Sequence, residues 1–386
     1  MEEVAEFCLK KAQELGCKYV EVRVEKRDSS GFILNNGNPE ISGFDIVSGV
    51  GVRYLINNNL GFFSTNNFEK EKMLSILKSS IRTTKNSSRI SKEIHLSIEK
   101  KEKASYKVSQ KEKINDFTED RKLNVLKEID NEIKYLPQRH ISLNDETAEK
   151  YYINSEGSKI YSFIPKISLM YFITVSENKK SIQRYISYGA SSGYEIIKKW
   201  NLIKKVPEEV RILRNNLVNG IKSPKGNMDL VIGSEVTGIA VHESVGHPYE
   251  ADRILGREAA QAGESFITQK MLNTKIGSKI VNVIEDPTLE NSYGFYLYDD
   301  EGVKAKKKYL IKKGIINEFL HSRETAFEMN TNSNGCSRAN NYDVEPMLRM
   351  SNTYVAAGDS SEEEIIKETK RGIYMKSYMQ WNIDDK

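Results

Sequence analysis

The sequence of 386 residues contains only three cysteines, Cys8, Cys17 and Cys336. An odd number of widely separated cysteines argues against a disulfide framework and is typical of a reducing compartment. Long apolar runs are also missing, because no stretch approaches the ~20 residues that a membrane-spanning helix requires. The opening residues 1–3 (MEE) lack the basic start of a secretory signal peptide. We therefore expect a cytoplasmic protein without a membrane partner.

Neither charge sign dominates the sequence, since 58 lysines and arginines stand against 54 aspartates and glutamates and leave a formal net charge of +4. A balance so close to zero does not indicate a polyanionic partner. The lysine-rich stretch 304–313 is interleaved with Tyr309, Leu310 and Ile311, as in a strand with a solvated face. We expect no nucleic-acid partner, and a nucleic-acid-associated protein is the weaker alternative that this stretch leaves open.

The composition is typical of a folded globular protein, with 38% hydrophobic and 29% charged residues. A length of 386 residues exceeds one typical domain. The Ser-Pro-Lys-Gly stretch at 223–226 has the composition of a linker. We therefore predict an N-terminal domain over residues 1–222 and a C-terminal domain over residues 223–386.

Hydrophobic periodicity predicts both helices and antiparallel strands. Apolar and polar residues alternate over 19–25, as in a strand with one solvated face, and again over 50–56 before an Asn-rich turn. Helices joined to hairpins of this kind indicate an α+β fold. The expected helices are 3–15, 66–82, 111–136, 207–220, 234–243 and 360–372, and the lysine- and serine-rich stretch 83–103 is expected to be exposed. The expected strands are 19–25, 50–56, 61–63, 151–153, 160–164, 167–175, 182–188, 228–232, 280–284, 307–311 and 315–320. Of these, 228–232 is expected to be a short buried strand.

The segment 241–247 (VHESVGH) holds two of the five histidines in the sequence, and Glu243 directly follows the first of them. Neutral imidazole is a good zinc ligand, and a carboxylate beside the metal can accept a proton from water. This pattern predicts a hydrolytic zinc site in the second domain, with His242 and His247 as ligands and Glu243 as the general base. Two structural histidines at a helix end are the alternative.

The spacing of the two histidines is unusual, because they stand five positions apart. In a regular helix at about 100° per residue, their side chains would point roughly 140° apart, which is too far for one metal ion. A single π-turn, or a helix end at Gly246, would bring them together. We therefore predict a distorted helix end here. Downstream, Glu250 and Asp252 are candidates for hydrogen-bond acceptors of the imidazoles, for a third ligand, or for solvated loop acids.

Four ordered motifs give the sequence a resemblance to a known family. They are the glycine-rich segment 45–66 (DIVSGVGVRYLINNNLGFFSTN), HESVGH at 242–247 with Glu250 and Asp252, the acidic turn 299–302 (DDEG), and RMSNTY at 349–354 followed by GIY at 372–374. With these motifs the chain resembles the TldD/PmbA family of zinc-dependent peptidases over nearly its whole length. Because it keeps HExxxH, it resembles the TldD-like, metal-binding subunit.

The resemblance implies a two-domain α+β protein that cleaves short or unstructured peptides inside a dimer cavity. It implies zinc held by His242 and His247, Glu243 as the general base, and a partner that is either a PmbA/TldE-like subunit or a second copy. Members of the family continue past GIY into a segment with a cysteine proposed as third zinc ligand, whereas this sequence stops at Lys386. Cys336 precedes RMSNTY and does not match that cysteine, although a thiolate could bind zinc. We therefore expect an incomplete zinc site and an uncovered sheet edge.

The function predicted from these observations is a zinc-dependent metallopeptidase. The alternative is a non-catalytic subunit or scaffold of a TldD/PmbA-type dimer. Hydrolysis also requires a group that stabilises the oxyanion, and His321, Tyr249 and Arg349 are candidates by residue type alone.

Overall fold

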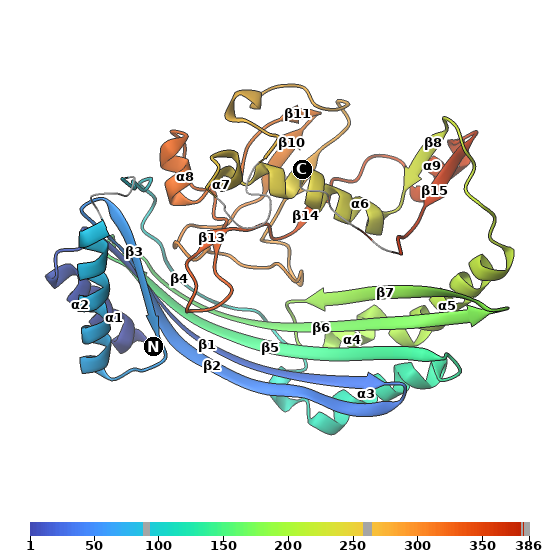
Figure 1. The fold of residues 1–386 in the computed structure, drawn as a ribbon, viewed down its shortest axis with the longest axis horizontal. Coiled ribbons are helices and arrows are strands. Elements are labelled where there is room, and N and C mark those ends of the chain that lie inside the picture. Colours follow the sequence, from blue (N-terminus) through green and yellow to red (C-terminus); the bar gives the residue numbers. More distant parts are fainter. Residues whose placement is uncertain (88–92, 258–264, 380, 382–386) are drawn as a thin grey trace.

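The computed structural model describes residues 1–87, 93–257, 265–379 and 381. A long, curved sheet is built from the first half of the chain, and residues from about 225 onward lie over its concave face (Figure 1). The strands of the curved sheet are β1 (Tyr19–Asn35), β2 (Asn38–Ile56), β3 (Asn59–Thr65), β4 (Lys103–Lys107), β5 (Gln138–Asn154), β6 (Lys159–Glu177) and β7 (Lys180–Ala190).

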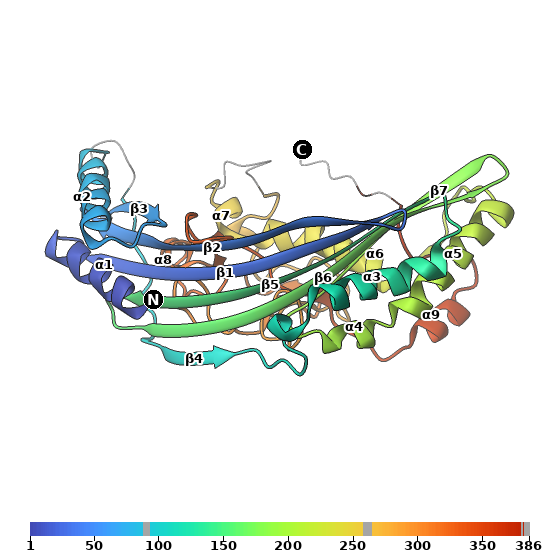
Figure 2. The same cartoon turned by 90° about the horizontal axis from the view of Figure 1, so that it is seen from below.

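The curved sheet has the strand order β3-β2-β1-β5-β6-β4, and β7 also pairs with β6. All of its pairs are antiparallel apart from β4 and β6, which are parallel. Helices cover the convex face, as Figure 2 shows from below. They are α1 (Glu2–Glu14), α2 (Lys70–Ser87), the 3-10 turn η1 (Ile114–Asp116), α3 (Glu119–Ile133), α4 (Glu195–Trp200) and α5 (Leu202–Asn219).

Two apolar cores lie between the sheet and these helices. Val20, Val22 and Val24 of β1 pack in the core formed with α1 and α2. Farther along the same strand, Phe32 and Leu34 pack in the core formed with α3 and α5. Since side chains on a strand alternate between faces, the residues between these apolar positions point to the concave side. The alternation that predicted β1 therefore also determines which side chains face the C-terminal half.

The C-terminal half consists of short elements. Its main sheet has the order β11-β10-β9-β14, while β12 pairs with β13 and β15 pairs in parallel with β8. No helix among the described residues is long and apolar enough to cross a membrane. The strands are β8 (Asp229–Ile232), β9 (Val283–Glu285), β10 (Lys308–Lys312), β11 (Ile315–Ile316), β12 (Ser337–Arg338), β13 (Met347–Leu348), β14 (Thr353–Val355) and β15 (Gly372–Met375). The helices are α6 (Ser234–Val241), the π-turn η2 (His242–Gly246), the 3-10 turns η3 (His247–Tyr249) and η4 (Gln269–Met271), α7 (Ala251–Ile254), α8 (Arg323–Glu328) and α9 (Glu362–Glu368).

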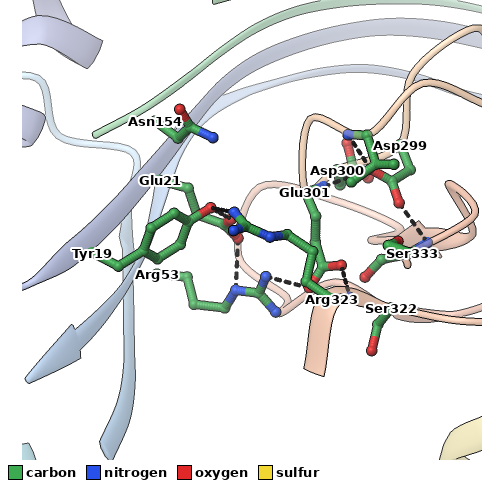
Figure 3. A network of polar contacts seen from close by, with 12 residues as sticks. Tyr19, Glu21, Arg53, Asn154, Asp299, Asp300, Glu301, Ser322, Arg323 and Ser333 are labelled. Atoms are coloured by element: carbon green, nitrogen blue, oxygen red, sulfur yellow. Dashed lines mark hydrogen bonds and ion pairs between the residues drawn. The ribbon is translucent and has the colours of Figure 1, made fainter. Parts of the chain in front are cut away.

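A buried polar network joins the two halves (Figure 3). The guanidinium of Arg53 in β2 donates to Glu21 of β1 and to Glu301 of the C-terminal half, both at 2.6 Å. Arg323 at the start of α8 donates to the hydroxyl of Tyr19 at 3.0 Å and to the carbonyl of Ser97 at 2.6 Å. The acidic turn at 299–302 is thus a point of attachment to the curved sheet.

The α+β fold with antiparallel sheets predicted from the sequence is confirmed. The solvated face predicted for residues 19–25 is wrong, because Glu21, Arg23 and Glu25 are 3%, 4% and 1% exposed beneath the C-terminal half. The strand predicted as buried at 228–232 is wrong in burial, since Leu230 and Ile232 of β8 are exposed.

Element boundaries differ from the expectations at several prolines and turns. Pro207 lies inside α5 instead of starting it, and β6 continues through Pro165 as one strand. The helix expected over 111–136 is divided into η1 and α3. In the lysine- and serine-rich stretch 83–103, α2 continues to Ser87 and Ser97 is buried, while residues 88–92 lie outside the described residues.

Candidate metal centre

The two histidines of HESVGH lie at the end of α6, where the helix changes its winding. α6 (Ser234–Val241) passes directly into the π-turn His242–Gly246. Within it, the backbone N–H of His247 donates to the carbonyl of His242, which is the five-residue hydrogen bond of a π-helix. The extra residue in the turn places the two imidazoles on one side, with ring centroids 4.8 Å apart. The distortion predicted from the spacing is confirmed.

Gly246 makes this turn possible because another part of the chain passes very close to it. A Cβ at Gly246 would lie 1.7 Å from Sδ of Met350. Met350 belongs to the RMSNTY motif, which leads into β14. The adjacent Ser351 is fixed in turn, since its backbone N–H donates to Glu285 at 2.6 Å. The motif therefore packs directly behind the histidine turn.

Glu250 contacts the ring of His247 at Nδ1. Its Oε2 lies 3.0 Å from Nδ1 of His247 and accepts from Nε of Arg253 at 2.8 Å. Glu250 is fully buried, whereas the side chain of His247 is 28% exposed. A carboxylate on Nδ1 leaves Nε2 as the free ring nitrogen, and metal-binding histidines commonly have such a partner. Asp252, in contrast, accepts from the backbone N–H of Arg253.

His242, Glu243 and His247 form a donor set that fits a zinc-type ion. One ligand atom from each side chain lies within 4.8 Å of the others. Among the described histidine, cysteine and acidic residues, these three form the group that could hold a metal ion. Burial and then the neighbouring His247 lower the pKa of His242. A lowered pKa keeps its imidazole neutral, which is the form that binds metal.

Cys336 does not belong to this group. Its side chain is fully buried in the core of the C-terminal half, and its Sγ donates to Oδ1 of Asn334 at 3.3 Å. Burial raises the pKa of the thiol to about 11, so the thiolate needed for zinc is disfavoured. Cys336 is therefore a core residue, and the possibility that it supplies a third ligand is wrong for this structure.

A cavity of about 370 Å³ lies between the histidines and the concave face of the curved sheet. Arg349 lines this cavity together with His242 and His247, so one of the three candidates for oxyanion stabilisation is in reach of the site. Tyr249 is buried in the apolar core instead. His321 is buried beside Thr325, and burial lowers its pKa to about 4. Neither residue lines the cavity.

The opposite wall of the cavity comes from the first half of the chain, which the sequence did not connect with the site. Arg27 of β1, Lys150 of β5 and Lys166 of β6 face the cavity from three neighbouring strands. The signal available in the sequence was the presence of charged side chains at alternate positions of strands with one apolar face. That signal equally fits a solvated face, so only the three-dimensional arrangement identifies these residues.

Residues 20–83, 112–214 and 225–386 match domain 1, the central domain and the C-terminal domain of the PmbA/TldA metallopeptidases. The fold and the histidine turn thus occur in a chain whose three segments all correspond to one class of metallopeptidase. The chain belongs to the PmbA/TldA metallopeptidase family.

Similar proteins come from archaea and bacteria. A metalloprotease of Methanocaldococcus jannaschii is 31% identical over 97% of this chain and 81% of its own length. A zinc metalloprotease TldD homolog of Saccharolobus solfataricus is 25% identical over 96% of this chain and 79% of its own length. The crystal structure of TldE from Thermococcus kodakarensis superposes with a TM-score of 0.71 at 17% identity, over 97% of this chain and 81% of that one. A Bacteroides thetaiotaomicron protein described as a candidate modulator of DNA gyrase has a TM-score of 0.76 at 17% identity, with the same coverage. At this identity the structural matches establish the fold.

Proposed function

We propose that this protein is a zinc-dependent peptidase that hydrolyses short or unstructured peptides. The observation that carries the proposal is the π-turn, which brings His242, Glu243 and His247 together, with both histidines lining a cavity. The position of this cavity between two halves of the chain supports a peptide without stable structure as the substrate. The names of the relatives as metalloproteases support the same reaction class.

In this proposal His242 and Nε2 of His247 hold zinc, and Glu250 positions the ring of His247. When bound, zinc supplies a Lewis acid that lowers the pKa of a water molecule and polarises the peptide carbonyl. Glu243 accepts the proton of the attacking water and then donates it to the leaving amine. Its side chain is only 17% exposed and its Oε1 lies 3.8 Å from Nε2 of His242, so it is beside the proposed zinc ligands. Arg349 is the cavity-lining candidate for stabilising the oxyanion.

The proposed assembly is a dimer, either with a PmbA/TldE-like subunit or with a second copy of this chain. The likeness to TldE of Thermococcus kodakarensis supports the first arrangement. A non-catalytic or scaffolding subunit of such a dimer is the second candidate function. It differs from the peptidase in one measurable property, since a scaffold needs no zinc.

The test is the Glu243→Gln variant, compared with the wild type and with Glu290→Gln as a control at an exposed acidic residue. Zinc content is measured by mass spectrometry and cleavage by release of a quenched fluorescent peptide. We expect all three proteins to contain zinc and only Glu243→Gln to lose cleavage, by about 100-fold or more. Cleavage retained by zinc-loaded Glu243→Gln would refute the role of Glu243. Zinc-free wild-type protein that still associates with a partner would favour the scaffold.

A further inference from the structure

The cavity beside the histidines carries more cationic than acidic side chains. Five cations line it against three carboxyl groups. The cations are Arg27, Lys150, Lys166, Arg338 and Arg349, and the acids are Glu146, Asp299 and Asp300. A cavity with such an excess of positive charge attracts anionic ligand groups.

Two of the cations are already neutralised by ion pairs. Arg27 lies 3.3 Å from Glu146, and Lys150 lies 2.5 Å from Asp300. The carboxylates of Glu146 and Asp300 are therefore already paired with Arg27 and Lys150. The excess positive charge of the cavity comes from the remaining cations.

Lys166 is a half-buried lysine without an acidic partner. Within the described residues it makes no hydrogen bond or ion pair, and its ammonium lies 5.1 Å from the centroid of the Tyr293 ring. Glu146 stands opposite it in the register of β5 and β6, but the carboxylate of Glu146 pairs with Arg27. Lys166 also lines a second cavity of about 480 Å³, so it stands where the two cavities meet.

Arg338 repeats this arrangement on the other half of the chain. Its guanidinium lies 5.1 Å from the centroid of the Tyr296 ring, and Nη2 donates to the carbonyl of Met350. Its Nε is buried and has no hydrogen-bond partner among the described residues. A buried unsatisfied donor is costly, and a ligand that accepts from it would remove that cost. The tyrosine rings hold both cations in place without neutralising them.

We propose that Lys166 and Arg338 form a subsite that binds a carboxylate of the peptide substrate. The ligand is either the C-terminal α-carboxylate or an acidic side chain, since both offer the same pair of acceptor oxygens to a lysine and a guanidinium. The inference rests on the proposed peptidase function, because the same cavity contains His242 and His247. It adds a preference among peptides that the zinc site alone does not give.

The state of Lys166 agrees with this role. Burial lowers the pKa of Lys166 to about 8, while Glu146 partly opposes the shift and Arg338, Arg27 and Lys150 add to it. The side chain thus remains largely protonated at neutral pH. The ammonium group of Lys166 is desolvated and has no acidic partner among the described residues, so a bound carboxylate would stabilise it.

The experiment measures binding separately from cleavage. Zinc-loaded Glu243→Gln protein is titrated into fluorescein-labelled peptides of alanine and serine, and Kd is obtained from anisotropy. In the first pair, one peptide has a free C-terminal carboxylate and the other has an amidated C-terminus. In the second pair, both C-termini are amidated, and one peptide contains Glu where the other contains Gln. We expect the carboxylate form of at least one pair to bind about tenfold tighter or more. The pair that shows the preference identifies which carboxylate the subsite takes.

Variants made in the same background connect the preference with the two residues. Lys166→Met and Arg338→Met should each remove it, Lys166→Arg should retain it, and Lys180→Met on exposed β7 is the matched control. Equal Kd values within both pairs, or a preference that survives Lys166→Met, would overturn the proposal. The comparison of Kd values within the two peptide pairs uses protein without a substitution in the subsite. It therefore tests the proposal even if a subsite variant fails to fold. A preference in binding without any cleavage by wild-type protein would refute the peptidase but not the subsite.

Discussion

His247 is the residue whose surroundings best explain how the candidate metal centre is held. Its Nδ1 contacts Oε2 of the fully buried Glu250, and the same oxygen accepts a hydrogen bond from Nε of Arg253. This fixes the ring orientation and leaves Nε2 for a metal ion. Among the described residues His242 has no comparable buried carboxylate within hydrogen-bond distance, and it is more exposed, with 45% of its side chain accessible. The two proposed ligands are thus held to different degrees.

Glu250→Gln tests this positioning role. The amide keeps the size of the side chain but loses the negative charge that orients and polarises His247. We expect zinc affinity to fall by about 10- to 100-fold, measured by competition with a chromogenic chelator. Asp252→Asn should leave the affinity nearly unchanged, because its side chain accepts from a backbone N–H. An equal loss in both variants would show that the effect is not specific to the His247 contact.

The π-turn η2 is the element that converts a five-residue spacing into a common site. The sequence was sufficient to predict it, because His242 and His247 cannot meet in a regular helix and Gly246 lies between them. The sequence could not identify what stabilises the turn. Met350 lies about one hundred residues away in the chain and reaches Gly246 only in the folded structure. RMSNTY therefore acts as a support for the turn.

Gly246→Ala should break this support. The new Cβ would overlap Sδ of Met350, at 1.7 Å, so either the turn or the Met350 side chain has to move. We expect a loss of about 1–3 kcal/mol in the free energy of unfolding and a clear loss of zinc affinity, measured by urea denaturation and chelator competition. Gly238→Ala in α6 is the control, because nothing lies within 4 Å of its added Cβ. It should be neutral or stabilising by up to about 1 kcal/mol. Unchanged zinc affinity in Gly246→Ala would contradict the role of the close contact.

The local sequence patterns predicted where helices and strands form better than they predicted what covers each element. The alternation in β1 correctly indicated a strand, but Glu21, Arg23 and Glu25 looked like a solvated face and are in fact covered. A strand pattern records which residues share a face, whereas the partner of that face comes from distant sequence. The same reason explains why Lys166 was missed as a cavity residue. The boundary predicted between residues 222 and 223 stays a prediction.

In the whole molecule, buried ion pairs hold the C-terminal half on the curved sheet. Arg53 is 6% exposed and bridges Glu21 to Glu301, and Lys150 of β5 pairs with Asp300. Glu301 and Asp300 both belong to the acidic turn 299–302, and Asp300 and Lys150 also line the cavity. The geometry of the candidate site therefore depends on contacts between the two halves.

Arg53→Met should destabilise the protein strongly, because Glu21 and Glu301 would remain buried without their shared cation. We expect a loss of about 3–5 kcal/mol in the free energy of unfolding by urea denaturation. Arg211→Met removes an exposed pair with Glu208 and should change stability by no more than about 0.5 kcal/mol. Similar small effects from both substitutions would refute the structural importance of the buried pair.

The Asp300–Lys150 pair predicts a pH dependence. Burial opposes ionisation of Asp300, but Lys150 and Arg23 outweigh it and lower its pKa from 3.8 to about 2. The ionised pair therefore contributes stability above pH 3.8 and loses it as the pH falls toward 2. Relative to Asp300→Asn, the wild type should be more stable by about 2 kcal/mol at pH 6 and by about half of that at pH 3. Urea denaturation at both pH values measures the gap, and a gap that does not narrow would contradict the lowered pKa.

The central claim is that the π-turn forms a zinc site from His242 and His247. Its most direct test is anomalous diffraction at the zinc edge from crystals of the zinc-loaded protein. The account predicts a peak about 2.1 Å from Nε2 of His247 and from a ring nitrogen of His242, with Glu250 still on Nδ1 of His247. A fully occupied zinc peak elsewhere, or no peak at the two histidines in zinc-loaded crystals, would contradict it.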